Sequence, residues 1–437
     1  MKEGILGKVL IFMIFGLAVI AMLYVNSIYK EELSISLGVY GTVMLTYLLA
    51  KMILSFMYKP KIGNPPNLKV SVIIPFYNEK ANSVQDTIWS IVNQDYPIHE
   101  IIVVDDGSDG DGCYKEVLSI KEQLNNYKKK VGIDVTREDN SGKRIMYYTP
   151  KLISHRFSEN KGKRHAQIWG FERATGDVIL TVDSDGYLFP DAVRALLIPF
   201  HDSEVMAVTG HVNARNRIKN WFTKLIDMRY ENAFRVERAA QSVTGNVLIC
   251  CGPLSCYRRE VIIENLEQYG HQMFLGEVVQ AGDDRCLTNY AILKGKTVYQ
   301  ETARCITDVP ATLLQFIKQQ VRWNKSFFRE SLLALKIGVK KPIVLIWVVM
   351  ELALWIIFNV TLILGFVIKP VAMGWLMGIY YFACLCLSAY ARNVFYILRH
   401  PFIFLMAPIY GFIHIIVLFP LRIYALCTLK SNKWGTR

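Results

Sequence analysis

Two aspartates, Asp183 and Asp185, are the residues whose type and spacing first indicate chemistry in this chain. They follow the run 177–180, whose apolar residues are typical of a short buried β-strand. Ligands of open α/β sheets bind at the carboxyl ends of strands, and a hard divalent ion held by carboxylates and substrate phosphates would suit two acidic side chains there. Aspartate, serine and glycine are also ordinary turn residues, so this motif taken alone favours a plain turn.

A second acidic pair, Asp283 and Asp284, follows Gly282. Neighbouring like charges raise the pKa of one carboxyl group towards neutrality, which is what a general base requires. A helix N-cap would also explain an aspartate at this place. The pair is therefore a candidate base whose role depends on its surroundings.

Three residues that follow predicted strands could bind a nucleotide. Tyr77 and Glu79 could stack on and hydrogen-bond a nucleobase, and Asp106 could accept a hydrogen bond from a base or a ribose. A plain strand-to-helix turn would also explain the first two. The sequence has no G-x-G-x-x-G or Walker A pattern, so it does not favour a dinucleotide or P-loop site.

Two lysines and one helical motif could bind phosphates. Lys161 and Lys163 belong to a basic run that could pair with a diphosphate, although a solvated charge run is the commoner explanation. Gln319, Arg322 and Trp323 are spaced to lie on one face of a helix. An amide, a guanidinium and an indole together suit a phosphate and a sugar ring.

The elements that must position these residues alternate between strand and helix. Near-continuous apolar runs at 70–75 and 101–104 predict strands of a parallel sheet that is covered on both faces. Further strands are expected at 205–210, 244–257 and 298–302, and helices at 219–240, 282–293 and 313–335. The sequence therefore predicts an α/β domain.

The composition predicts that this domain is joined to membrane spans. The 437 residues are 52% hydrophobic and 20% charged, which is too apolar for an ordinary soluble enzyme and too charged for a purely transmembrane bundle. A net charge of +13 suits the cytoplasmic face of a membrane and the handling of anionic substrates. Nine cysteines show no C-x-x-C pair and no zinc spacing, so we expect reduced thiols in the cytosol.

Apolar stretches near both ends are the candidate spans. The first stretch, 5–25, lacks the small-x-small site of a cleaved signal peptide, and a second stretch follows at 35–57, so we expect two anchors. Lysines after the second stretch place the amino terminus and the residues after 59 in the cytoplasm. Spans are also expected at 343–368 and from 371 to about 390, whereas 401–429 fits one span, a re-entrant hairpin or two short helices.

The order of these motifs is more informative than any one of them. In this order they resemble the processive family-2 glycosyltransferases and, more narrowly, the bacterial (streptococcal-type, class I) hyaluronan synthases. The matching runs are 160–168, 209–218, 282–292, 319–331 and the terminal Trp434 to Arg437. The resemblance covers nearly the whole chain. It departs from the family at 113–145, where we expect a lengthened surface loop with a helix near 114–128, and at Cys251, where serine is usual.

The resemblance implies a GT-A-type nucleotide-sugar transferase domain with a mostly parallel sheet, flanked by transmembrane helices and interfacial amphipathic helices. The implied divisions are 1–59 for two transmembrane helices, 60–310 for the cytosolic transferase domain, 311–341 for an amphipathic interfacial helix, 342–429 for transmembrane or re-entrant helices, and 430–437 for a cytosolic tail.

The resemblance also assigns roles to individual residues. Asp284 would be the general base, and Asp185 with Asp183 would hold Mg²⁺ or Mn²⁺. The residues implied to bind the nucleotide are Tyr77, Glu79, Asp106, Lys161, Lys163, Asp183 and Arg322. Those implied to meet the acceptor at the channel mouth are Asp283, Gln319 and Trp323, and those implied to gate the site from the tail are Trp434 and Arg437.

The implied activity is the alternating transfer of GlcNAc and glucuronate from UDP-GlcNAc and UDP-GlcA to hyaluronan, with export of the polymer. The protein would be a multi-pass protein of the bacterial plasma membrane with a cytoplasmic catalytic domain. It would contact nascent hyaluronan and membrane lipids but no nucleic acid. It would act as a monomer. Glu351, Asn359 and Arg392 are candidates to line the export path. The alternatives are a chitin-oligosaccharide or cellulose-type synthase, or a non-enzymatic polysaccharide transporter or receptor.

Overall fold

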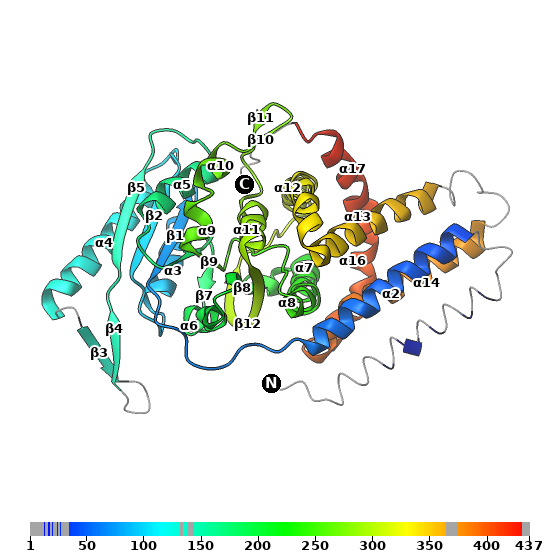
Figure 1. Ribbon diagram of the computed structural model, residues 1–437, viewed down its shortest axis with the longest axis horizontal. Helices are drawn as coiled ribbons and strands as arrows, with labels where there is room; N and C mark the ends of the chain where they lie inside the picture. Colours follow the sequence, from blue (N-terminus) through cyan, green and yellow to red (C-terminus); the bar gives the residue numbers. More distant parts are fainter. Residues whose placement is uncertain are drawn as a thin grey trace. The chain divides into compact units, whose positions relative to one another are not determined.

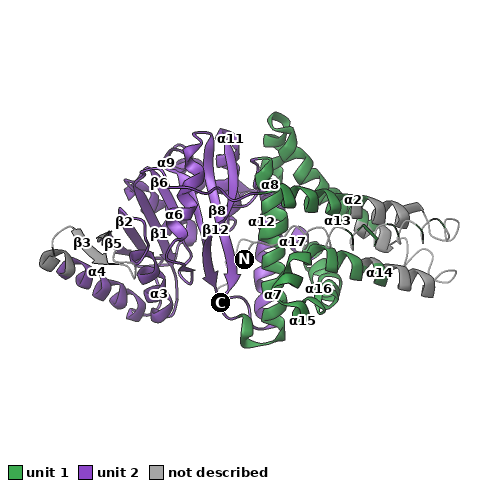
Figure 2. Ribbon diagram, turned by 90° about the horizontal axis from the view of Figure 1, so that it is seen from below, with its two compact units in different colours: residues 1–58, 217–244, 331–423 green, residues 59–216, 245–330, 424–437 purple. Residues whose placement is uncertain are grey.

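The computed structural model describes residues 13, 16, 17, 20, 24 and 27 and the ranges 35–131, 134–138, 144–363 and 374–430. Most of the first predicted span, the tail residues Trp434 and Arg437, and the side chain of Asn359 lie outside the described residues. The chain divides into two compact units (Figure 2). We call residues 59–216, 245–330 and those from 424 onward the sheet unit, and residues 1–58, 217–244 and 331–423 the helical unit.

The sheet unit is built on an eight-stranded mixed sheet with the order β5-β2-β1-β6-β9-β8-β12-β7 (Figure 1). Its strands are β1 (Val70–Phe76), β2 (Glu100–Asp105), β5 (Lys151–Arg156), β6 (Val178–Thr181), β7 (Tyr187–Leu188), β8 (Val205–Ala214), β9 (Ser255–Arg258) and β12 (Lys296–Thr307). Strands β5, β2, β1 and β6 pair in parallel, as do β8 and β12. Strand β9 runs antiparallel to β6 and β8, and β7 runs antiparallel to β12. The predicted mostly parallel sheet is therefore confirmed, with antiparallel strands inserted in it.

The central strands are mostly apolar because helices cover both of their faces. Every residue of β1 and β2 is buried. One core joins these strands to helices α5, α9 and α11, through residues such as Ile73, Phe171, Val261 and Leu287. Burying an isoleucine or phenylalanine of this kind stabilises the fold by roughly 1.5–3 kcal/mol relative to leaving it exposed.

The helices of the sheet unit carry or support the predicted site residues. They are α3 (Ala81–Val92), α4 (Gly112–Val131), α5 (Lys163–Arg173), α6 (Ala192–Leu197), η1 (Ile198–His201), α9 (Arg259–Ile263), α10 (Leu266–Gly270) and α11 (Asp283–Lys294). Helix α12 (Leu313–Lys340) begins in this unit and continues into the other. Two hairpins, β3 (Asp134–Glu138) with β4 (Arg144–Tyr148) and β10 (Met273–Phe274) with β11 (Glu277–Val278), complete the unit.

The predicted elements are confirmed at the apolar strands and at α7, α11 and α12, and they differ elsewhere. In the expected surface loop at 113–145, α4 confirms the helix predicted near 114–128, but the β3–β4 hairpin was not predicted. Only β9 forms in the expected strand region 244–257, because the residues before it make glycine-containing turns. The basic run is not a solvated segment: it begins helix α5, and Arg164 in it is buried.

The described residues of the helical unit form a series of helices. They are α2 (Ile35–Met57), η2 (Arg217–Lys219), α7 (Trp221–Asn232), the π-helix η3 (Ala233–Arg238), α8 (Ala239–Val243), α13 (Pro342–Ile363), α14 (Gly374–Arg392), η5 (Val394–Leu398), α15 (Pro401–Phe404), α16 (Ala407–Ile413), the π-helix η6 (His414–Leu418) and α17 (Phe419–Cys427). Helix α7 begins with a capping box in which Asn220 and Thr223 exchange hydrogen bonds, which satisfies two otherwise unpaired donors.

Among the described residues, one helical stretch, Pro401–Cys427, is long and apolar enough to cross a membrane by length and composition. Helices α2, α13 and α14 form where spans were predicted. The described apolar parts of α2 and α13, Thr46–Met57 and Pro342–Ile357, are shorter than a span. The membrane-crossing role of these three helices stays a prediction. Of the candidate path residues, Glu351 lies 3.9 Å from the ammonium of Lys51, a lysine whose side chain is 7% exposed.

Candidate active site

Four loops meet at one edge of the sheet because the parallel strands β5, β2, β1 and β6 all end there. The loop after β1 is tied to the loop after β2: Asn78 donates its backbone N–H to Ser108 Oγ (2.9 Å) and its side-chain amide to Asp109 Oδ2 (2.7 Å). Asn78 adopts a positive φ of 50°, a conformation that asparagine tolerates better than most residues. Tyr77 and Glu79 flank it and are half-buried.

The two aspartates after β2 have different surroundings. Asp105 is fully buried, accepts hydrogen bonds from Ser108 and lies 3.2 Å from Arg156 Nε, so it shapes the turn. Asp106 accepts hydrogen bonds from the backbone N–H groups of Lys161 (3.2 Å) and Gly162 (2.8 Å). Burial raises the pKa of Asp106 to about 6, although those two hydrogen bonds act to lower it. Asp106 thus holds the basic loop beside the predicted nucleotide residues.

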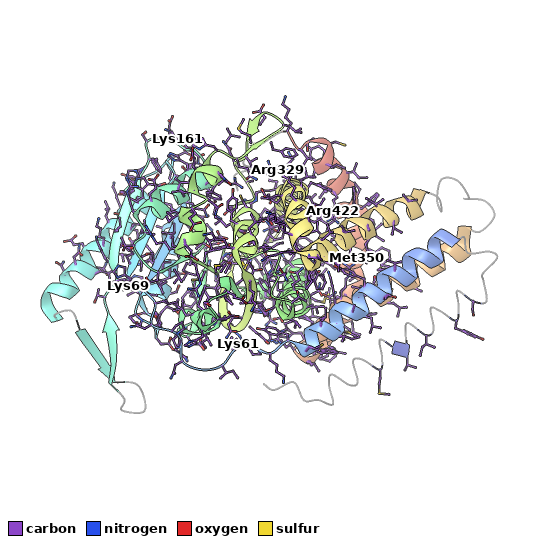
Figure 3. All side chains as sticks on the ribbon, viewed as in Figure 1. Lys61, Lys69, Lys161, Arg329, Met350 and Arg422 are labelled. Carbon is purple, nitrogen blue, oxygen red and sulfur yellow. The ribbon has the colours of Figure 1, made fainter. Side chains whose placement is uncertain are left out.

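The lysines of the basic loop separate in the structure. Lys161 is exposed and pairs with Glu159 at 3.2 Å; Figure 3 shows it at the surface of the sheet unit. Lys163 begins α5, and its Nζ lies 2.8 Å both from Asp183 Oδ1 and from Asp283 Oδ2. Burial opposes the charge on Lys163, but the surrounding carboxylates outweigh it and raise the pKa of the ammonium. One cation therefore joins the Asp-x-Asp motif to the second acidic pair.

The pKa values of Asp283 and Asp284, at the start of α11, are shifted in opposite directions. Burial would raise the pKa of Asp283, but Lys163, Arg164 and Arg322 hold it below its ordinary range. For Asp284, burial and the charge of Asp283 raise the pKa well above that of an ordinary aspartate, and Lys163 compensates only in part. This is the arrangement in which one member of an acidic pair serves as a general base near neutral pH.

Gly252 lies where the carboxylates of Asp183 and Asp284 converge. Its backbone N–H donates to Asp284 Oδ2 at 3.0 Å. A Cβ atom at this position would meet Asp183 Oδ2 at 2.9 Å and Asp284 Oδ1 at 3.1 Å. Sequence reasoning missed this residue, because nothing in the local pattern shows which carboxylates surround it.

Two carboxylates at the end of β6 are the candidate ligands of a divalent ion. Asp185 is buried, whereas Asp183 already accepts a hydrogen bond from Lys163. Within the described ranges no three histidine, cysteine or acidic residues are grouped as a metal cage. In phosphate-binding sites, however, Mg²⁺ is commonly held by one or two carboxylates together with the phosphates of the substrate. The residues present therefore fit an ion that arrives with a diphosphate.

The predicted helical motif lies on α12. Gln319 and Arg322 are half-buried, and Trp323 leaves 43% of its surface exposed. In the described part of the chain, the Oε1 atom of Gln319 is buried without a hydrogen-bond partner, so it can accept a hydrogen bond from a ligand. Arg322 lies close enough to Asp283 to help lower the pKa of that carboxyl group. Its contribution is smaller than those of Lys163 and Arg164.

The structure brings five of the predicted site residues together in the sheet unit. Asp183, Lys163, Asp283 and Asp284 form the connected centre, with Arg322 close by. Lys161 pairs away from that centre with Glu159. Cys251 precedes Gly252, and its Sγ lies 3.2 Å from Thr209 Oγ1, an interaction that a serine hydroxyl could also make.

A mixed α/β sheet with acidic loops at its parallel edge defines the chain as a nucleotide-sugar transferase of the GT-A type. Residues 71–266 match the model of glycosyl transferase family 2, and residues 178–425 match that of glycosyl transferase family group 2. The chain therefore belongs to the family-2 glycosyltransferases, as its motifs predicted.

Two groups of curated relatives are similar over most of their length. The hyaluronan synthases of Streptococcus pyogenes serotypes M6 and M3 are each 47% identical over 433 residues, which cover 99% of this chain and 98% of theirs. An N-acetylglucosaminyltransferase of Mesorhizobium japonicum is 34% identical over 387 residues, 86% of this chain and 85% of that protein. A mannosyltransferase from Pyrobaculum calidifontis, solved with GDP-Man and Mn²⁺, shares the fold with a TM-score of 0.61 at 19% identity, over 91% of this chain and 98% of that one.

Proposed function

We propose that this chain is a hyaluronan synthase, which adds GlcNAc and glucuronate in turn from UDP-GlcNAc and UDP-GlcA to a growing polymer. The observation that carries the transfer chemistry is the cluster in which Lys163 joins Asp183 to Asp283 while the neighbouring Asp284 keeps a raised pKa. The choice of polymer is supported by 47% identity to hyaluronan synthases along 99% of the chain.

The nucleotide would lie over the loops after β1, β2 and β5. Tyr77 would stack on the uracil, while Glu79 and Asp106 would hydrogen-bond the base and ribose. The two oxygens of Asp106 already accept backbone hydrogen bonds, but each carboxylate oxygen has a second lone pair. Lys161, which is exposed beside this loop, would turn towards the diphosphate.

Asp185, with Asp183, would hold the divalent ion, Mg²⁺ or Mn²⁺. When bound, the ion neutralises charge on the diphosphate and so makes UDP a better leaving group. Arg322 would hydrogen-bond the same phosphates from α12, as a guanidinium does well. The protein groups themselves orient the donor and shield the departing charge from water.

Asp284 would act as the general base. Its ionised carboxylate would take the proton from the acceptor hydroxyl as that oxygen attacks the anomeric carbon from the side opposite UDP, and the sugar would be inverted. The Gly252 N–H would hold one carboxylate oxygen in place, which leaves the other for the acceptor. Trp323 and Gln319 would seat the acceptor sugar, with Asp283 beside them.

Export would follow from the helical unit. A polar, anionic polymer needs a wetted path through the bilayer, so we propose that several helices besides Pro401–Cys427 cross the plasma membrane and that the sheet unit faces the cytoplasm. The protein would function as a monomer among membrane lipids. Trp434 and Arg437 would gate the nucleotide from the tail.

The test is to incubate the purified membrane protein with each UDP-sugar singly and with both together. We expect a polymer that hyaluronan lyase degrades only when both donors are present. Polymer from UDP-GlcNAc alone would instead support the single-donor alternative, which the 34% identity to an N-acetylglucosaminyltransferase keeps open. No UDP release with any donor would support the non-enzymatic alternative.

A further inference from the structure

A buried tyrosine and a buried glutamine form a chain of two hydrogen bonds that ends on Asp283 of the acidic pair. Gln167, on α5, donates from Nε2 to Asp283 Oδ2 at 3.3 Å. Tyr269, on α10, donates its hydroxyl to Gln167 Oε1 at 2.5 Å. The residues are 2% and 1% exposed. Gln167 lies in the matching run 160–168, but neither residue received a role from the sequence. These two hydrogen bonds therefore form in a dry environment, where a donor left without a partner is costly.

The tyrosine decides which way the glutamine amide points. An amide oxygen can only accept a hydrogen bond and an amide nitrogen can only donate one. Because the Tyr269 hydroxyl donates to the oxygen, the nitrogen of Gln167 must face Asp283. Burial raises the pKa of Tyr269, so the hydroxyl keeps its proton and remains the donor.

The ring of Tyr269 is itself held by a buried cation. The guanidinium carbon of Arg164 lies 4.8 Å from the ring centroid, and Arg164 Nη1 donates to Gln272 Oε1 at 2.6 Å. Arg164 Nη2 lies 4.0 Å from Oε1 of Glu330. The same oxygen accepts a hydrogen bond from Gln272 Nε2 at 2.8 Å. Glu330 is on α12, the helix that carries Gln319, Arg322 and Trp323. A continuous set of buried contacts thus runs from the acceptor helix to Asp283.

We propose that Tyr269 and Gln167 are positioning residues that fix the Asp283 carboxylate and, through it, the Lys163 ammonium between the donor and acceptor carboxylates. The proposal rests on the proposed transferase function. Lys163 contacts Asp183 and Asp283 at equal distances of 2.8 Å, so a rotation of Asp283 would release one end of this bridge. The Asp283 carboxylate would then also lie in a different position beside Asp284, the base that follows it in the sequence.

The test compares Tyr269→Phe, Gln167→Met and the double variant in the full-length protein. We expect Tyr269→Phe to lower kcat about threefold to tenfold, the range that loss of one hydrogen bond supports, with KM for the donor changed by less than about twofold. Gln167→Met removes both hydrogen bonds at similar volume and should lower kcat by about tenfold or more. If the tyrosine acts only through the glutamine, the double variant should match Gln167→Met.

Tyr96→Phe is the matched control. Tyr96 is also a buried tyrosine of the sheet unit, and its hydroxyl donates to the backbone oxygen of Leu68 at 2.7 Å. We expect this variant to lower the melting temperature without changing kcat. The proposal is overturned if Tyr269→Phe leaves kcat unchanged, as Tyr96→Phe should. It is also overturned if the losses in kcat from Tyr269→Phe and Gln167→Met multiply in the double variant.

The choice of polymer does not affect this comparison. If the wild-type protein uses one donor instead of two, the hyaluronan proposal fails, but kcat and KM can still be compared on that donor by measuring UDP release. The comparison of kcat between the double variant and Gln167→Met then still tests the positioning proposal.

Discussion

Gly252 donates its backbone N–H to the Oδ2 atom of Asp284 across 3.0 Å, and its own Cα faces both that carboxylate and Asp183. A methyl group at this position would lie 2.9–3.1 Å from three carboxylate oxygens, which is closer than carbon and oxygen normally approach. We expect Gly252→Ala to push the two carboxylates apart and to lower kcat by roughly tenfold to a hundredfold, because catalytic groups tolerate displacements of less than an ångström. Measuring UDP release against donor concentration separates this loss in kcat from a change in KM.

Gly110→Ala is the control for this substitution. Gly110 lies in the loop after β2 and has open space where a Cβ atom would be added. It should leave kcat and the melting temperature unchanged. An unaltered kcat in Gly252→Ala would show that the convergence of the two carboxylates has no catalytic role.

The raised pKa of Asp284 predicts an acid limb in the pH profile. Burial first and then the charge of Asp283 shift this pKa upwards, so the ionised base is lost at a higher pH than for an exposed aspartate. We expect kcat/KM to fall about tenfold per pH unit once the pH drops below the raised value. A profile that stays flat down to the pKa of an ordinary carboxyl group, about 4, would contradict the assignment.

Asp284→Asn should separate activity from stability. A carboxyl group whose pKa is raised by folding stabilises the fold while it is protonated, and this contribution disappears as the pH rises through the raised pKa. Above that pH, the neutral amide should therefore keep or raise the melting temperature while UDP release falls by about a thousandfold. Loss of activity together with unfolding would indicate a structural role instead.

The parts of the fold that sequence reasoning found are those with a strong local pattern. Strands β1 and β2 are near-continuous apolar runs because both faces are covered. Strand β5 was missed because it is an edge strand whose residues are mostly half-buried and polar. Its sequence carries no alternation or apolar run from which a strand could be inferred.

The site was predictable as a set of residue types but not as a set of contacts. Two acidic motifs and a basic run indicated a phosphate-handling centre. The burial of Lys163 and Arg164 depends on carboxylates at Asp283 and Glu330, which lie more than 100 positions away in the sequence. Gln167 and Tyr269 are ordinary residues locally, and only the tertiary structure brings them to Asp283.

Lys163→Met should remove the cation between the donor and acceptor carboxylates. Its side chain is 19% exposed and those of Asp183 and Asp283 are 30% and 10% exposed, so neither carboxylate is fully hydrated. Leaving them without the ammonium should destabilise the protein by roughly 3 kcal/mol and abolish turnover. Thermal unfolding and UDP release measure the two effects.

Lys161→Met is the comparison for stability. Lys161 is half exposed and pairs with Glu159, an interaction worth no more than about 1 kcal/mol at the surface. Its loss should leave the melting temperature unchanged and raise KM for the donor. Equal destabilisation by both substitutions would mean that the Lys163 bridge is no stronger than a surface ion pair.

Removal of divalent ions should stop transfer, because the carboxylates of Asp185 and Asp183 repel a diphosphate unless a cation lies between them. In the part of the chain that is described, no third ligand completes a cage around them, so we expect the ion to bind tightly only with the nucleotide. Isothermal titration should therefore show weak Mg²⁺ or Mn²⁺ binding to the protein alone and stronger binding when UDP is present. Asp185→Asn should weaken that UDP-dependent binding by at least about tenfold. Asp202→Asn, at a carboxylate that pairs with Lys296 at the surface, should not change it. Full activity in excess chelator, or equal metal binding by both variants, would remove Asp185 from the metal site.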